Sequence, residues 1–168
     1  TTDEQSIYYS AYDVAPGTGL TWSYYAADSV DLPATDIGGY LASGVLDQTP
    51  LYLGVTYTLS WSKSADSVPA ELLDPNNSGN MLNSLIVWSG YLQAPASGDF
   101  AFKLRADDGA KFFIDVDGVI QSVSAQWWTT QDMAGILNVT GLEAGQSYRI
   151  WMFMKPGGTV LASSVDNV

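Results

Sequence analysis

Apolar and polar residues alternate along much of the chain, and this pattern predicts β-strands. The clearest case is residues 51–62, where every second residue is large and apolar. Successive side chains of a strand point to opposite faces, so one face should contact the core and the other water. We therefore expect one strand here, with an inward face made of Leu51, Leu53, Val55, Tyr57, Leu59 and Trp61.

Nine further segments have strand-like composition and are bounded by turn-forming residues. In residues 99–106 and 111–116 the apolar positions again share one face. Residues 147–154 are apolar on both faces, which predicts a central strand. Asp117-Gly118 is a strong hairpin signal. The expected strands are Ile7–Tyr12, Leu20–Tyr25, Leu82–Gln93, Asp99–Ala106, Lys111–Val116, Val119–Gln121, Ile136–Thr140, Ser147–Met154 and Thr159–Val165.

Two long stretches lack such a pattern and are expected to be irregular loops. They cover residues 26–44 and 63–80, with at most one helical turn near residues 70–73. About ten short strands without a convincing helix indicate an all-β fold, an antiparallel β-sandwich or jelly roll with long irregular loops. A length of 168 residues fits one domain, so we expect a single domain over residues 1–168.

Composition excludes several classes of function. The chain has 18 acidic and 6 basic residues, and its formal net charge of −12 argues against nucleic acid and anionic membrane as partners. It contains no histidine and no cysteine, which excludes disulfides, Ser-His-Asp or Cys-His catalysis and histidine-based zinc sites. A divalent cation would need oxygen ligands, and such ligands suit calcium or magnesium.

No apolar run approaches the roughly 20 residues of a membrane helix, and no signal segment begins the chain. The first residue is Thr1. We expect an excised, monomeric domain of a longer exported protein, located outside the cell.

Asp107 and Asp108 interrupt the strand pattern just before a glycine. In a regular strand they would point to opposite faces, so a joint role needs a sharp turn or a cis peptide bond. They are equally compatible with a solvated turn between two strands and with a calcium site. From the residues alone, both interpretations stay open.

Several motifs in sequence order resemble the protective-antigen-type (PA-fourteen) domain, a family that includes the lectin heads of yeast flocculins and epithelial adhesins. The similar stretches cover roughly 150 residues. They are Gly19-Leu20-Thr21, Gly90-Tyr91-Leu92, Pro95-Ala96-Ser97-Gly98-Asp99-Phe100-Ala101-Phe102, Asp107-Asp108-Gly109 followed by Ile114-Asp115, and Leu142-Glu143-Ala144-Gly145-Gln146-Ser147-Tyr148-Arg149-Ile150.

The resemblance implies a calcium-dependent lectin that binds cell-surface or extracellular glycans. In the lectin members, two adjacent aspartates joined by a cis peptide hold one Ca²⁺, so Asp107 and Asp108 are the expected ligands. A second loop adds backbone carbonyls and often an Asn side chain, and neighbouring sugar hydroxyls complete the coordination. That loop corresponds to residues 155–159, which contain no Asn. The expected calcium ligands there are carbonyls near Gly157 and Thr159, and Lys155 and Gly158 are expected to contact the sugar.

Trp127 and Trp128 lie in a polar stretch, and either could provide an aromatic wall for a sugar ring. The alternative is that at least one of them is buried in the core, as the resemblance implies. A second cation candidate is Asp74–Gly79, which opens like an EF-hand loop. The twelfth position of that loop is Leu85, where the ion needs a bidentate Glu.

Two other classes of function remain possible at this stage. The chain could be a glycosidase whose acid-base partner is Glu71, Glu143 or a distant Asp, although two residues that share one ion would lie too close together for the required ~5–9.5 Å. It could also be a spacer or protein-docking module of the same fold without lectin activity. The absence of Asn from residues 155–159 favours that alternative.

Overall fold

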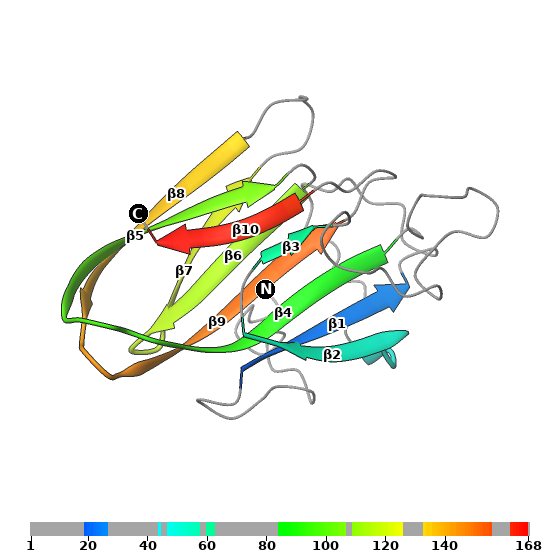
Figure 1. Cartoon of the computed structure of the whole chain (residues 1–168), viewed down its shortest axis with the longest axis horizontal. Coiled ribbons are helices and arrows are strands. Elements are labelled where there is room, and N and C mark those ends of the chain that lie inside the picture. Colours follow the sequence, from blue (N-terminus) through cyan, green and yellow to red (C-terminus); the bar gives the residue numbers. More distant parts are fainter. Residues whose placement is uncertain are drawn as a thin grey trace.

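The structure, a computed structural model, is an all-β sandwich (Figure 1). It describes residues 19–26, 44, 47–57, 60–62, 84–106, 109–125, 133–155 and 162–167. Within these ranges no helix is long and apolar enough to cross a membrane. The described part of the chain contains ten strands, β1 (Leu20–Ala26), β2 (Tyr52–Thr56), β3 (Ser60–Ser62), β4 (Ser84–Gln93), β5 (Gly98–Ala106), β6 (Gly109–Val116), β7 (Val119–Ala125), β8 (Met133–Leu142), β9 (Ser147–Lys155) and β10 (Ala162–Asn167).

The strands form two antiparallel sheets. The six-stranded sheet has the order β2-β1-β4-β9-β6-β7, and the four-stranded sheet has the order β3-β10-β5-β8. Strand β9 lies between β4 and β6, and it is buried on both faces from Ile150 to Met154. The predicted antiparallel sandwich and the predicted central strand are both confirmed.

The main core lies between the two sheets. Alternate residues of β5, β6 and β9 point into it, as their period-2 patterns predict. Phe102 of the four-stranded sheet packs against Phe112 of the six-stranded sheet, with ring centroids 5.5 Å apart. The core residues are Leu20, Tyr24, Ile86, Trp88, Ala94, Phe102, Leu104, Ala110, Phe112, Ile114, Val139, Leu142, Tyr148, Ile150, Met152 and Met154.

The central strands of the six-stranded sheet are also buried on the face that points away from the four-stranded sheet. The sequence predicted this for β9 only, because that strand is apolar on both faces. Phe113, Trp151 and Phe153 point away from the main core, yet all three are buried. Phe113 and Phe153 meet edge to face at a centroid distance of 5.5 Å. Tyr25 and Val87 extend this buried layer over β1 and β4. The sheet therefore has apolar contacts on two sides, which explains why so much of its sequence is apolar.

The prediction for residues 51–62 is wrong in two respects. The segment forms two strands in different sheets, β2 in the six-stranded sheet and β3 in the four-stranded sheet. In addition, the apolar side of β2 faces outward, since Leu53 is 47% and Val55 58% exposed. Leu51 and Tyr57, on the same side, are also exposed.

Trp22 of β1 explains the reversed orientation of β2. Its ring packs on Tyr52 at 4.8 Å and stacks on Trp88 at 6.5 Å, so it fills the core side beside β2. A Cβ atom at Gly54 would collide with Nε1 of Trp22. Period-2 alternation identified the strand correctly, but the large neighbouring side chain determined which side faces the core.

Because Leu53 is exposed, we expect Leu53→Lys to change the free energy of unfolding by no more than about 0.5 kcal/mol. If Leu53 were in the core, as its sequence pattern predicts, a buried lysine would cost several times as much. Urea unfolding followed by circular dichroism distinguishes the two cases. A loss above about 2 kcal/mol would contradict the outward orientation of β2.

Most other strand predictions are confirmed with small shifts in their ends. The Asp117-Gly118 turn has the expected positive φ values, 54° and 82°. Strands β7 and β8 are longer than predicted. Strand β10 is described from Ala162, and the predicted start at Thr159 lies outside the described residues. The predicted strand Ile7–Tyr12, the irregular stretch 63–80 and all of 26–44 apart from residues 26 and 44 lie outside the described residues.

The end of the sandwich that contains residues 94–97, 117–118 and 143–146 is called the turn end below (Figure 1). Hydrogen bonds join two of these turns: Gly145 N donates to Ala94 O at 2.8 Å and Ala144 N to Ser97 Oγ at 2.9 Å. Glu143 N donates to the hydroxyl of Tyr148, also at 2.8 Å. The turn end is therefore held by bonds between segments that are far apart in sequence.

Removal of the Tyr148 hydroxyl should loosen this end. We expect Tyr148→Phe to lower the free energy of unfolding by about 1–2 kcal/mol, because the part-buried Glu143 N–H loses its acceptor. Thermal denaturation measures the loss, and hydrogen exchange at the Glu143 amide should accelerate in the variant. Unchanged exchange at that amide would contradict the bond.

Candidate functional site

The opposite end of the sandwich contains the residues on either side of Asp107 and Asp108, and we call it the aspartate end. Strand β5 stops at Ala106 in one sheet, and β6 starts at Gly109 in the other. Residues 107–108 therefore connect the two sheets. Strand β9 stops at Lys155 and β10 starts at Ala162, so residues 156–161 also connect the two sheets.

The strand register brings the ends of these two connections together. Ala106 lies opposite Ser163, one residue into β10, and Gly109 lies opposite Lys155, the last residue of β9. Cα atoms of directly opposite residues in antiparallel strands are about 4.5–5.5 Å apart. The two connections therefore start and end next to each other, with one pair of neighbouring ends in each sheet.

The segment that contains Trp127 and Trp128 also begins and ends here. Ala125, the last residue of β7, pairs with Ala110, and Met133, the first residue of β8, pairs with Ala106. Residues 126–132 thus connect the sheets at the same end as the other two segments. Three separate parts of the sequence with predicted site residues meet at one end of the fold.

The predicted ligands themselves lie outside the described residues. This holds for Asp107, Asp108, Gly157, Gly158 and Thr159. It also holds for Trp127 and Trp128, whereas Lys155 is the terminal residue of β9. The cis peptide, the calcium ligands and the sugar contacts therefore remain predictions.

The strands that lead into this end are firmly anchored. Leu104, Ala110 and Met154 are all buried, each within three residues of a connecting segment. Lys111 places its ammonium group 4.8 Å from the ring centroid of Phe113, on the face away from the main core. Rigid strand ends are the kind of support that a cation or ligand site on short connections requires.

The described residues offer no competing metal site. They contain no group of three or more Asp, Glu, His or Cys residues that could hold a metal ion. The candidate Asp74–Gly79 lies outside the described residues. Its twelfth position, Leu85, is a fully buried residue of β4 without a side-chain oxygen.

The position of Glu143 excludes it as a glycosidase partner of the aspartate pair. It lies at the turn end, just after Leu142, which pairs with Gly98 at the far end of β5. The nine residues from Gly98 to Ala106 make eight steps and span about 26 Å at 3.3 Å per step. A glycosidase pair needs carboxyl groups about 5–9.5 Å apart. Glu71, the other candidate, lies outside the described residues.

A polar cavity lies at the turn end, and no sequence motif marks it. Tyr91, Asp115, Asp117, Gln146 and Arg149 are among its lining residues. They come from β4, the β6–β7 hairpin and the start of β9. In sequence they are scattered, and only the strand register brings them together.

A protein-family model described as the PA14 domain matches residues 72–159, just over half of the chain. No curated protein sequence matches the chain. Among solved structures, the fold is similar to an anti-sigma factor domain-containing protein from Clostridium clariflavum. That pair has 21% identity and a TM-score of 0.56, and the match covers 95% of this chain and 44% of the other.

A second similar structure is the A domain of epithelial adhesin 6 from Candida glabrata, in complex with Galβ1-3GlcNAc. It has 18% identity and a TM-score of 0.58, with 92% of this chain and 80% of the other covered. A third is a β-glucosidase from Kluyveromyces marxianus in complex with glucose, at 15% identity and a TM-score of 0.58, with 89% and 16% covered. At these identities the similarity shows the fold alone, and the chain spans less than half of the first and third proteins.

Proposed function

Since the chain belongs to the PA14 domain family, we propose that it is a calcium-dependent carbohydrate-binding module of a large cell-surface adhesin. The main support is the register at the aspartate end, where Ala106 lies opposite Ser163 and Gly109 opposite Lys155. Because residues 107–108 and 156–161 connect these paired residues, both segments begin and end at the same place. A cation shared between the two segments requires this arrangement.

The residues of these segments suit calcium chemically. Asp107 and Asp108 supply carboxylate oxygens, and the backbone near Gly157 and Thr159 supplies carbonyls. Calcium takes 6–8 oxygen ligands at about 2.3–2.6 Å in a flexible geometry. Such an ion supplies open positions for two neighbouring hydroxyls of a sugar.

The remaining predicted contacts would orient the sugar. Lys155 can donate hydrogen bonds to hydroxyls, and the backbone at Gly158 allows close approach because it has no side chain. Trp127 or Trp128 can cover one face of a pyranose ring. A sugar recognised mainly through one pair of hydroxyls should bind with a Kd near 1 mM, about −4 kcal/mol, so firm adhesion needs many copies.

The similar structures support a glycan partner. Two epithelial adhesin A domains from Candida glabrata are in complex with Galβ1-3GlcNAc, and a third, subtype-switched domain is in complex with β-lactose. These are properties of those proteins. For this chain we infer a single monomeric domain within a longer extracellular protein, with glycans as its partners.

Calcium titration followed by glycan screening tests the proposal. Wild-type protein, Asp108→Asn and Glu143→Gln are titrated with calcium by calorimetry. The three proteins are then applied to immobilised glycans, including Galβ1-3GlcNAc and lactose, with calcium or with EDTA. Glu143→Gln is the matched control, because it removes one carboxylate from an exposed turn at the other end of the molecule.

We expect glycan retention in calcium by the wild type and by Glu143→Gln, and loss of retention in EDTA or in Asp108→Asn. Calcium uptake without binding to any glycan would instead favour a spacer or docking module. Turnover of an oligosaccharide would favour a glycosidase. The proposed site would be contradicted if, with calcium present, the glycan surface retained Asp108→Asn as strongly as wild type.

A further inference from the structure

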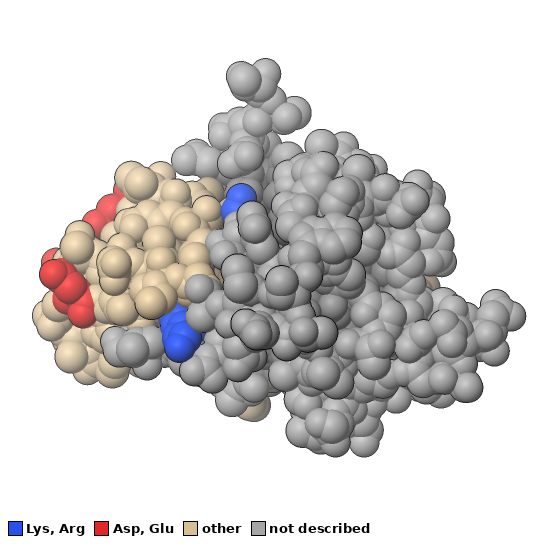
Figure 2. Space-filling view, turned by 90° about the horizontal axis from the view of Figure 1, so that it is seen from above, with Lys and Arg blue, Asp and Glu red and all other residues tan. Residues whose placement is uncertain are grey.

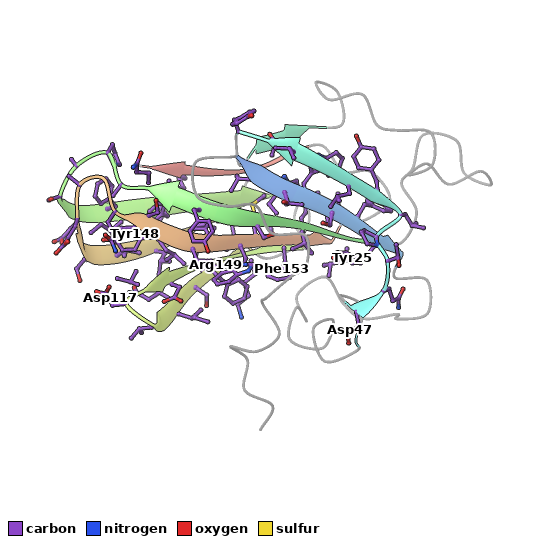
Figure 3. The ribbon with its side chains drawn as sticks, turned by 90° about the horizontal axis from the view of Figure 1, so that it is seen from below. Tyr25, Asp47, Asp117, Tyr148, Arg149 and Phe153 are labelled. Carbon is purple, nitrogen blue, oxygen red and sulfur yellow. The ribbon has the colours of Figure 1, made fainter. Side chains whose placement is uncertain are left out.

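The cavity at the turn end has a volume of about 330 Å³. Its size is at the lower end of the range for ligand pockets, roughly 300–1,000 Å³, and suits one or two pyranose rings. Figure 3 shows Asp117, Tyr148 and Arg149 at the same end of the molecule, with Phe153 farther along β9. The cavity lies at the start of β9, and the nine residues of this strand, eight steps of about 3.3 Å, span about 26 Å to Lys155 at the aspartate end.

Arg149 is held in place by aromatic side chains. The centre of its guanidinium lies 5.3 Å from the ring centroid of Tyr91 and 5.3 Å from that of Trp151. Its Nη1 atom donates a hydrogen bond of 3.0 Å to the hydroxyl of Tyr91. Trp151 is 2% exposed and provides a fixed support. The guanidinium is therefore oriented before any ligand binds, which reduces the entropic cost of binding.

The strand register places a carboxylate on the other side of Arg149. Tyr91 lies opposite Arg149, and the β6–β9 ladder ends with the pair Ile114 and Ile150. Asp115 follows Ile114 directly in β6, and it lines the same cavity as Arg149. Asp115 Oδ1 accepts a hydrogen bond from Gly118 N at 2.8 Å, which fixes this carboxylate beside the hairpin turn.

The charges of the cavity favour a neutral ligand. Among the described lining residues, the two carboxylates of Asp115 and Asp117 outnumber the one cationic group, Arg149. Figure 2 shows acidic side chains at the same end of the molecule, and Asp99 and Glu143 are in or next to the turns there. Negative charge around a cavity lowers the local concentration of anions, so phosphate, sulfate and uronate ligands are disfavoured.

The hydrogen-bonding groups of the cavity further restrict the class of neutral ligand. Ionised carboxylates only accept hydrogen bonds, and a guanidinium only donates them. A ligand that hydrogen-bonds to both the carboxylates and the guanidinium in one small cavity must have donors and acceptors at neighbouring positions. Sugar hydroxyls do both, and the exposed part of Tyr91 offers an apolar ring surface beside them.

We propose that the turn-end cavity is a second saccharide site, which binds a neutral sugar directly through Arg149, Asp115 and Asp117 without calcium. The site lies about 20–26 Å from the aspartate end, the span along β9 from Arg149 or Ser147 to Lys155. It allows one domain to contact two glycans, or two distant parts of one glycan. Because no residue is shared between the two ends, this proposal stands or falls independently of the calcium site.

The test is nuclear magnetic resonance titration of the whole chain, once in EDTA and once with calcium. Galactose, glucose, mannose, fucose and N-acetylglucosamine are added to ¹⁵N-labelled protein up to about ten times an expected Kd near 1 mM. We expect at least one sugar to shift the amide resonances of Gly118, Gln146 and Arg149. Arg149→Met, which keeps an apolar stem between the two rings, should weaken that binding by at least about 10-fold.

Asp117→Gly provides a second variant, because glycine adopts the positive φ of this turn position and removes only the carboxylate. It should also weaken the binding, whereas Glu143→Gln and Asp108→Asn should leave it unchanged. Absence of shifts at these amides with every sugar would overturn the proposal. So would shifts that appear only with calcium, or that persist with equal affinity in Arg149→Met and Asp117→Gly. Calcium-dependent shifts confined to the residues next to Asp107 and Asp108 would overturn this proposal while supporting the proposed function.

Discussion

Trp88→Ala should lower the free energy of unfolding by about 3–5 kcal/mol, the range for deletion of a large aromatic side chain from a core. Trp88 is 1% exposed and belongs to the central part of the six-stranded sheet. It lies opposite Trp22 on β1 and opposite Met152 on β9, and its ring stacks on that of Trp22. Alanine would leave a cavity among rings that cannot collapse into it.

Urea unfolding followed by tryptophan fluorescence and circular dichroism measures this loss. Because a domain is usually stable by about 5–15 kcal/mol, the variant should be close to the limit of folding at 37 °C. Ile136→Ala is the control. It also removes an apolar side chain from a strand, but Ile136 is 58% exposed, so its loss should stay within about 0.5 kcal/mol. Equal losses in both variants would contradict the assignment of Trp88 to the core.

Period-2 alternation predicted most of the fold, because it depends on which side of a strand contacts the core. It worked for β5 and β6, which lie inside their sheets with a paired strand on either side. It failed for β2, an edge strand, because Trp22 of β1 occupies the core side there and Gly54 accommodates it. The local sequence of one strand gives no information about the size of a side chain on the neighbouring strand.

The strand pairing was not predictable in the same way. Ala106 and Ser163 are 57 positions apart in sequence, yet they are paired, and nothing near either residue indicates this. The proposed calcium site was predicted because Asp107 and Asp108 are adjacent and follow a family motif. The turn-end cavity has no such motif, since Tyr91, Asp115 and Arg149 become neighbours only through two strand ladders.

Calcium should stabilise the folded domain measurably if the aspartate end holds the ion. A ligand that binds only the folded state adds about 2.7 kcal/mol of stability when its concentration is 100 times its Kd. For a chain of 168 residues this corresponds to a rise in Tm of about 5–11 °C. Differential scanning fluorimetry with increasing calcium, and then with excess EDTA, measures the shift and its reversal.

Asp108→Asn should lose most of the calcium-induced rise in Tm. With calcium present, the variant should therefore be less stable than wild type. Without calcium, the variant should be at least as stable as wild type, because it relieves the repulsion between two adjacent carboxylates. Glu143→Gln should keep the full calcium-induced rise. Magnesium should give a smaller rise, since it demands octahedral geometry at about 2.0–2.1 Å and releases water reluctantly. An equal rise in Tm for wild type and Asp108→Asn would place the ion elsewhere and remove the physical basis for calcium-mediated sugar binding at the aspartate end.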